Sequence, residues 1–322
     1  MKGRFCLMWG KFAGRDFLDK DTMPAFRFKR FSVEHERSTM KVGTDGVLLG
    51  AWASLPERPE IGDGLAVAGR SAEPLGVSGG TLSAESPRRF LDVGCGCGLI
   101  AMMLAQRLAL AGWRPEEAKV DALDLDAASC EEALSNTASS RYREYLSVSC
   151  LDYRDLPDSF PPRSYSRIVS NPPYFRESLK CPKAQRNQAR HADTLPFEEL
   201  LSVSERLLEP GGRLCLILPP DSWECVQRLL PEHAPLLELC RLARVFSKPG
   251  KACERVMAEW VRREEATRRA SHQRLWVLPK EESASNGMCL NGVDIQDILI
   301  HDEAGGYTEE YRALVKGFYL WA

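Results

Sequence analysis

The chain has 322 residues, 44% of them hydrophobic and 27% charged, which suits one large α/β domain or two small ones. A formal net charge of −2 excludes a molecule that is basic throughout, so any surface for nucleic acid has to be local. The 11 cysteines include no CxxC pair and no apolar run approaches the roughly 18 residues that span a bilayer, so we expect a cytoplasmic protein with reduced thiols, no metal and no membrane span.

The first part of the chain divides into three segments. Residues 1–22 differ in character from the rest of the chain, and Met23 opens a plausible start of its own, so we expect a weakly ordered extension or a misplaced start, and not a signal peptide. Residues 23–56 are expected to flank the active site. Residues 57–87 are rich in Gly, Ser, Ala and Pro without a sustained period, which predicts a flexible insertion.

Residues 88–322 alternate between strand and helix patterns and are expected to form one domain. The strand patterns lie at 88–94, 119–126, 145–152, 166–174 and 213–220, and a terminal pair lies at 238–248 and 255–263. The helix patterns lie at 99–112, 127–140 and 196–212, the last with Pro196 near its start and glycines after its end, and 307–322 suggests a short helix with a docked aromatic end. This alternation predicts a mostly parallel, doubly wound sheet.

A glycine-rich loop comes after the first of these strands. The stretch LDVGCGCG places Asp92, Gly94, Gly96 and Gly98 between a strand and a helix. Glycines let the backbone approach a ligand closely at the start of a helix, and the acid at the strand end can take a cationic amine of the ligand. A tight strand–helix turn without a ligand is the alternative.

Acidic residues end the next two strands as well. Asp124 can accept both hydroxyls of a ribose, with Asp126 as the neighbouring candidate or, more simply, as a helix N-cap. Asp152 can accept from an adenine amine, and Tyr153 offers a face beside that base. Each acid alone is more often a cap or a solvated loop residue. Three of them at the carboxyl edge of one sheet favour a ligand site, because open α/β sheets bind ligands there.

The order DVGCGCG, LDLD, LDY, NPPY resembles class I S-adenosylmethionine-dependent methyltransferases, in the branch that methylates amino nitrogens. The resemblance implies a Rossmann-like, seven-stranded, mostly parallel sheet with an antiparallel final hairpin and helices on both faces. It also implies S-adenosyl-L-methionine as the cofactor. Asp124 stands where relatives commonly have glutamate. Cys95 and Cys97 stand where relatives often have threonine or other small residues, so we interpret them as small loop residues.

The corner Asn171, Pro172, Pro173, Tyr174 is the candidate catalytic site. The Asn171 side-chain oxygen and the Pro172 carbonyl can accept both hydrogens of an amine and aim its lone pair at the methyl group. The prolines lock this geometry, and Tyr174 supplies a stacking face for an unstacked base. A simple turn after a strand is the alternative. The motif serves adenine, cytosine and glutamine-amide methylation alike.

Three further stretches narrow the resemblance: residues 26–53, residues 175–191 and the last 16 residues. They resemble the bacterial tRNA1(Val) adenine-N6-methyltransferases, a family that acts on adenosine 37 beside the anticodon. The resemblance implies that Lys41, Thr44 and Asp45 form a lid near the cofactor. It also implies that Asn171 belongs to the cofactor-binding site. A helix cap at Thr44 or Asp45 is the plain alternative.

Two basic runs flank the predicted site and suit the phosphate backbone of tRNA, although a charge run is often just a solvated face. The candidate nucleic-acid-binding residues are Arg27, Lys29, Arg30, Arg176, Lys180, Lys183, Arg186 and Arg190. Phe26, Phe28 and Phe31 can stack bases, but their spacing fits a half-buried strand better.

The sequence leaves two other functions open. One keeps the amino chemistry and changes the acceptor to adenine in rRNA or DNA, or to a protein glutamine. The other is a non-catalytic RNA-binding protein on the same fold.

Overall fold

The computed structural model describes residues 25–58, 87–156, 161–173, 196–264, 288–290 and 292–322. The expected extension at 1–22 and nearly all of the expected insertion at 57–87 lie outside these residues. So do Tyr174 and the basic residues predicted between positions 176 and 190.

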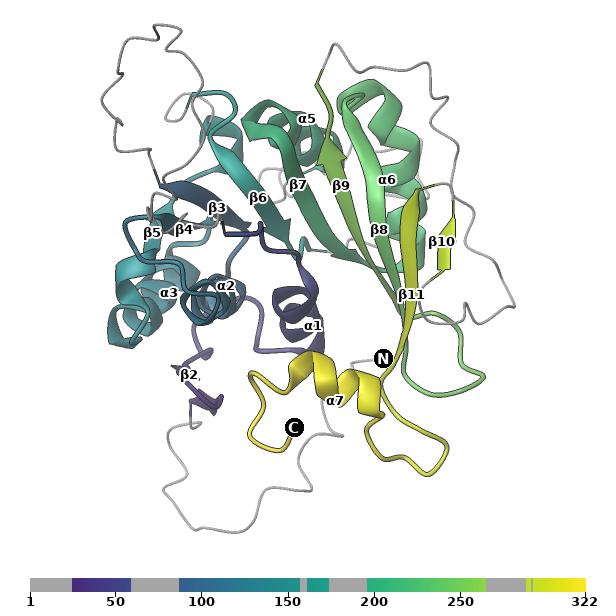
Figure 1. Ribbon diagram of the computed structural model, residues 1–322. Coiled ribbons are helices and arrows are strands. Elements are labelled where there is room, and N and C mark those ends of the chain that lie inside the picture. The colour runs from purple at the N-terminus through teal and green to yellow at the C-terminus, as the bar shows by residue number, and fades with distance from the viewer. Residues whose placement is uncertain (1–24, 59–86, 157–160, 174–195, 265–287, 291) are drawn as a thin grey trace, which may run out of the picture.

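One nine-stranded sheet organises the chain, in the order β10-β11-β8-β9-β7-β6-β3-β4-β5 (Figure 1). Five of its eight strand pairs are parallel, and β9 runs antiparallel between β7 and β8. The mostly parallel sheet with an antiparallel hairpin is therefore confirmed, and β11 and β10 widen it beyond the expected seven strands. The strands are β3 (Arg88–Val93), β4 (Ala118–Asp124), β5 (Leu146–Cys150), β6 (Tyr165–Ser170), β7 (Leu208–Leu218), β8 (Leu237–Phe246), β9 (Arg255–Arg262), β10 (Met288–Leu290) and β11 (Val293–Leu299).

Helices cover both faces of the sheet and enclose a separate apolar core on each (Figure 1). Side chains of β7 alternate between the two, because successive residues of a strand point to opposite faces: Cys215 and Ile217 join the core under α1 and α2, and Leu216 joins the core under α5 and α6. None of the helices in the described part of the chain is long and apolar enough to span a membrane. The helices are α1 (Thr44–Trp52), α2 (Leu99–Leu110), α3 (Ala127–Ser139), α5 (Phe197–Leu207), α6 (Pro220–His233) and α7 (Glu309–Val315), with short 3-10 turns η1 (Arg143–Tyr145) and η2 (Tyr153–Asp155).

The end of α5 differs from the prediction. The helix stops at Leu207 and β7 begins at once with Leu208, so the glycines expected beyond the helix lie inside the strand. Gly211 has φ +78°, and the pairing with β6 shifts register here. This irregularity of the strand favours glycine at Gly211, because the left-handed backbone region is strained for other residues.

The first and last of the described segments pack together beside α1. A two-strand hairpin, β1 (Phe26–Arg27) with β2 (Ser32–Val33), places Phe28 and Phe31 in the core, where Phe28 stacks on Tyr319 at 5.8 Å between ring centroids. The burial expected from the phenylalanine spacing is confirmed, but a continuous strand is not, because β1 ends at Arg27 and Phe28 and Phe31 lie between the two strands. The short C-terminal helix and its docked aromatic end are confirmed as well, since Phe318 and Tyr319 are buried.

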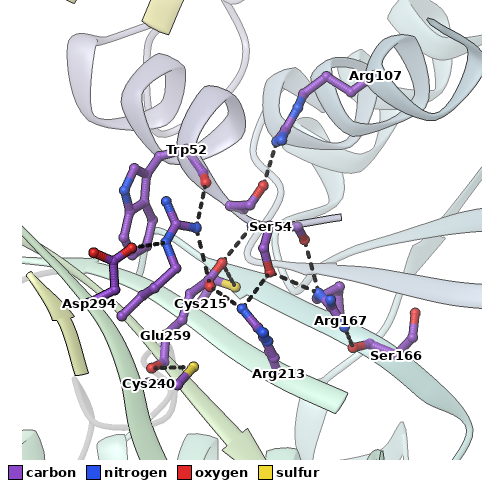
Figure 2. A network of polar contacts seen from close by, with 12 residues as sticks. Trp52, Ser54, Arg107, Ser166, Arg167, Arg213, Cys215, Cys240, Glu259 and Asp294 are labelled. Atoms are coloured by element: carbon purple, nitrogen blue, oxygen red, sulfur yellow. Dashed lines mark hydrogen bonds and ion pairs between the residues drawn. The ribbon is translucent and has the colours of Figure 1, made fainter. Parts of the chain in front are cut away.

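Arginines from three other elements satisfy the carbonyl groups at the C-terminal end of α1, which has no basic residue in its own last turn (Figure 2). Arg107 of α2 donates to the carbonyls of Gly50 and Ala53, at 2.9 and 2.6 Å. Arg241 of β8 donates to Trp52, and Arg167 of β6 donates to the Ser54 carbonyl. Cations at a helix C-terminus are favourable because unsatisfied carbonyls concentrate negative charge there.

A single buried carboxylate completes this arginine cluster (Figure 2). Glu259 of β9 accepts from the Ser54 N–H at 2.5 Å and pairs with Arg213 and Arg241 at 3.0 and 3.3 Å. Burial alone would raise the pKa of Glu259, but Arg241, the Ser54 N–H and Arg213 outweigh it and hold the pKa below its ordinary value. Glu259 therefore stays ionised in the folded protein and ties α1 to the sheet.

Replacing Glu259 by Gln should lower the free energy of unfolding by about 3 kcal/mol, because a partly buried arginine pair loses its counter-charge. In the wild type this stabilisation is present above pH 4.5, the ordinary pKa of glutamate, and is lost as the pH falls through the depressed pKa of the folded state. Urea denaturation across pH 3 to 8 measures both effects.

Glu238→Gln on β8 is the matched control. Glu238 also pairs with an arginine, Arg263, but the two side chains are 50% and 52% exposed. Its loss should cost less than about 1 kcal/mol. Equal losses in the two variants would contradict the role given to Glu259.

Candidate active site

A cavity of about 390 Å³ opens at the carboxyl edge of the sheet. Its walls are the glycine loop after β3 with the start of α2, the segment that leads into α1 with the start of that helix, the residue after β6, the turn between β8 and β9, and the residue after β11. The lining residues are Met40, Lys41, Gly43, Thr44, Asp45, Gly46, Leu48, Gly94, Cys95, Gly96, Cys97, Leu99, Ile100, Asn171, Val245, Glu254, Arg255 and Ile300. Segments more than 200 residues apart in the sequence thus meet at one site.

The glycine loop turns tightly because three glycines take left-handed backbone angles: φ is +69° at Gly94, +53° at Gly96 and +82° at Gly98. A Cβ added at Gly94 would meet nothing within 4 Å, so this residue leaves room for a ligand. Gly98 instead begins α2 and faces Ala133 of α3, 3.4 Å from the added Cβ. The first two glycines line the cavity and the third sets helix packing.

Asp92 lies beneath the loop and does not line the cavity. Its Oδ2 accepts the N–H of Ala101 in the first turn of α2 at 2.9 Å, and its Oδ1 is buried without a partner among the described residues. Burial raises the pKa of Asp92 to about 7. Its evident role is to hold the start of α2. Contact with a ligand amine stays a prediction.

Asp124 ties the loop to the neighbouring strand. Its Oδ2 accepts from the Gly96 N–H at 2.8 Å and its Oδ1 from the Asp126 N–H at 2.9 Å. Each carboxylate oxygen has further acceptor capacity, so the predicted hydrogen bonds to ribose hydroxyls stay open. Asp126 is a helix N-cap, the simpler of its two interpretations: its carboxylate caps α3 by accepting from the Ser129 N–H and hydroxyl.

The structure corrects the expectation for Tyr153 at the end of β5, whereas the contact of Asp152 with an adenine amine stays a prediction. The Tyr153 ring is buried in the core under α5, with its hydroxyl 2.9 Å from Ser204 Oγ, so it presents no face to an adenine. The Asp152 carboxylate is held by the Arg154 guanidinium, which lowers the pKa of Asp152. The η2 turn after β5 directs the ring inward, and Asp152 does not line the cavity.

The predicted lid residues do border the cavity. The Lys41 ammonium donates to the carbonyls of His35 and Glu36 at 2.7 and 2.6 Å, which closes its own loop. Thr44 and Asp45 are the first residues of α1, whose N-cap is Gly43, so the alternative that either side chain caps this helix is wrong. Asp45 instead pairs with Arg255 at 2.7 Å.

Asn171 is buried and leads directly from β6 into the cavity wall. The hydroxyl of the preceding Ser170 donates to the Val93 carbonyl at 2.8 Å, which locks the end of β6 to the end of β3. This places Asn171 beside the glycine loop. Pro172 is buried and Pro173 is exposed.

The predicted basic surface is only partly present among the described residues. Arg27 and Arg30 are exposed. The Lys29 ammonium instead donates to the carbonyl of Lys316 and to the terminal residue Ala322, both at 2.6 Å, so it anchors the C-terminus. Two of its three N–H donors are thus engaged at the end of the chain, and its contact with a phosphate stays a prediction.

Two cysteines of the glycine loop line the cavity without being reactive thiolates. Burial raises the pKa of Cys97 to about 12 and that of Cys95 well above its ordinary value. Their interpretation as small loop residues agrees with this burial.

Four lining residues come from parts of the chain where no site residue was predicted: Val245, Glu254, Arg255 and Ile300. The sequence could have indicated the first three, because they lie at the turn of the predicted terminal strand pair. When the first strand of such a pair runs parallel to the sheet, its turn lies at the carboxyl edge. Ile300 comes directly after β11, a strand that the sequence did not predict.

The Methyltransferase small domain model matches residues 80–223. A tRNA1(Val) (adenine(37)-N6)-methyltransferase of Phocaeicola vulgatus is 34% identical over 92% of this chain and 98% of its own length. The chain belongs to this methyltransferase family. A protein of the same name from Bacteroides fragilis is 36% identical over 73% of this chain and 83% of its own length. Among solved structures, a predicted O-methyltransferase from Agrobacterium tumefaciens superposes with a TM-score of 0.52 at 15% identity, over 85% of this chain and 96% of its own, and supports the fold alone.

The buried Asp92 predicts a pH dependence of stability. Its pKa is about 7 in the folded protein against an ordinary 3.8, so between these values the folded state binds the proton more tightly than the unfolded state. The free energy of unfolding should therefore fall as the pH rises from 4 to 7, by at most about 4 kcal/mol. Asp92→Asn should remove this fall.

Chemical denaturation of both proteins at several pH values provides the measurement. Asp155→Asn, in the exposed η2 turn, is the control and should keep the wild-type profile. The same slope in the wild type and in Asp92→Asn would refute the assignment.

Proposed function

We propose that this protein transfers a methyl group from S-adenosylmethionine to the N6 amine of an adenosine in tRNA, adenosine 37 of tRNA1(Val), in the cytoplasm. The observation that carries the proposal is the burial of Asn171 in the same cavity as the glycine loop. The names of relatives that match over 92% of the chain supply the substrate. The eight free cysteines among the described residues fit a reducing compartment.

The residues of the cavity fit the cofactor. S-adenosylmethionine supplies a methyl group on a positively charged sulfur, together with a ribose, an adenine and an amino-acid end. The open space at Gly94 suits the close approach of the cofactor backbone. Asp124 does not itself line the cavity, but it holds Gly96, which does, and its carboxylate would accept the ribose hydroxyls. The N-cap residues of α1 and α2 are glycines without a capping side chain, and in the first turn of α2 Asp92 engages the Ala101 N–H; the remaining N–H groups of these first turns would donate to the carboxylate of the cofactor.

The corner after β6 suits the amine. The lone pair of an adenine amine is conjugated with the ring, so methylation needs the nitrogen to become pyramidal. The Asn171 side-chain oxygen and the Pro172 carbonyl would accept one amine hydrogen each and favour that shape. Two consecutive prolines keep the backbone rigid, so little ordering is needed when the base binds. Tyr174, as a stacking face, is part of the proposal but lies outside the described residues.

Nucleoside analysis tests the proposed function. The full chain is incubated with S-adenosylmethionine and a tRNA1(Val) transcript, and the digested RNA is analysed by liquid chromatography and mass spectrometry. We expect N6-methyladenosine in this transcript and none in a transcript with guanosine at position 37. If native unmodified tRNA also stays unmethylated, the assignment to tRNA fails.

Asn171→Ala should lower kcat at least 100-fold, in the range seen when one preorganised hydrogen-bonding group is removed from an active site. The dissociation constant for the cofactor should change less than about threefold, because Asn171 acts on the amine. Single-turnover kinetics and calorimetry measure the two effects.

Gln227→Ala is the control for Asn171→Ala. Gln227 is also a buried amide, but it lies on α6 at the other face of the sheet. It should leave turnover unchanged. Full activity of Asn171→Ala would show that the corner is a structural turn.

A further inference from the structure

Strand β9 holds α1 at both ends. Arg255, Met257 and Glu259 are alternate residues of the strand and point to the same face of the sheet. Arg255 pairs with Asp45 in the first turn of α1, and Glu259 accepts from Ser54 just beyond the last turn. Met257 lies between them, fully buried in the core that contains Leu48.

The lengths of the two elements match. Arg255 to Glu259 spans roughly 13 Å of strand. Asp45 to Trp52 rises roughly 10 Å along the helix, and the two residues that lead to Ser54 make up the difference. The two charged attachments to β9 can therefore lie at opposite ends of α1.

The two attachments differ in surroundings. Glu259 is fully buried, whereas the Asp45 and Arg255 side chains are 25% and 32% exposed and line the cavity. Arg255 also donates to the carbonyl of Glu254 at 2.7 Å, which fixes its guanidinium on its own strand. A partly exposed ion pair contributes little to global stability. We therefore expect the attachment at the cavity end to order the first turn of α1 without adding much to the stability of the whole protein.

The order of the first turn of α1 affects how tightly a ligand binds in the cavity. Gly43, Thr44, Asp45 and Gly46 line the cavity, and two of these four residues are glycines, which lose the most backbone freedom on ordering. Without the ion pair, the ligand would have to order this turn when it binds, and that cost would appear as weaker affinity.

We propose that Arg255 is a positioning residue for the cofactor, acting through Asp45 to hold the first turn of α1 against the cavity. The inference rests on the proposed function insofar as the ligand is S-adenosylmethionine. It adds a residue from β9, far from the glycine loop in sequence, to the determinants of cofactor affinity.

Calorimetric titration with S-adenosylhomocysteine tests the proposal without any tRNA. Arg255→Ala in the full chain should weaken binding about tenfold and raise the KM for S-adenosylmethionine similarly, with kcat within about threefold of the wild type. Its melting temperature should fall by less than about 4 °C. Arg255→Lys keeps the charge and should fold normally with an intermediate affinity.

Arg244→Ala is the matched control. Arg244 of β8 forms an equally short pair with Asp297 of β11, at 2.7 Å, and neither residue lines the cavity. This variant should lose thermal stability and keep the wild-type affinity. If Arg255→Ala weakened binding only through a general loss of stability, Arg244→Ala would weaken it as well.

A double-mutant cycle shows whether Arg255 acts through Asp45. Asp45→Asn should weaken binding, and the double variant Asp45→Asn/Arg255→Ala should be no weaker than the weaker single variant. Additive losses would overturn the proposal, because each residue would then act on the ligand separately. So would unchanged affinity in Arg255→Ala and Arg255→Lys. A wild type that binds no S-adenosylhomocysteine would refute the proposed function as well.

Discussion

The arrangement of this molecule depends on the buried contact between Glu259 and the chain just beyond α1. One carboxylate receives the Ser54 N–H and the charges of Arg213 and Arg241. Arg241, Arg107 and Arg167 also donate to carbonyls at the end of α1, so their charge meets the negative end of the helix. The cluster is stable because every cation has an acceptor, and it fixes α1 to the face of the sheet that carries the active site.

The position of α1 in turn defines the cavity. Its first turn forms one wall, and the glycine loop, Asn171 and the ends of β8, β9 and β11 form the others. Two carboxylates support the loop in different ways. Asp124 offers both oxygens to backbone N–H groups, whereas Asp92 is buried with one oxygen bonded and its pKa raised by burial. Both acids thus serve the geometry of the loop, whatever else they bind.

Several parts of the site were predictable because they depend on local rules. Glycines in a strand–helix turn, an acid at each strand end and an asparagine before two prolines are visible as letters, and parallel strands bring their carboxyl ends to one edge. The error concerns the direction of a side chain: Tyr153 turns into the core, where its hydroxyl meets Ser204, 51 residues away. Asp152 and Lys29 already have protein partners, Arg154 two residues away and the carbonyl of Ala322, 293 residues away. Of these three contacts, only the one between Asp152 and Arg154 is local in the sequence.

By itself, the sequence determined the alternation of strands and helices, the mostly parallel sheet, the glycine loop and the corner at Asn171, because each depends on residues that are neighbours in the chain. The tertiary structure alone decided which strand lies beside which helix. Arg255 meets Asp45 across 210 residues, and Glu259 meets Ser54 across 205. Such contacts depend on strand order and on the path of α1 over the sheet, and packing of the whole chain sets both.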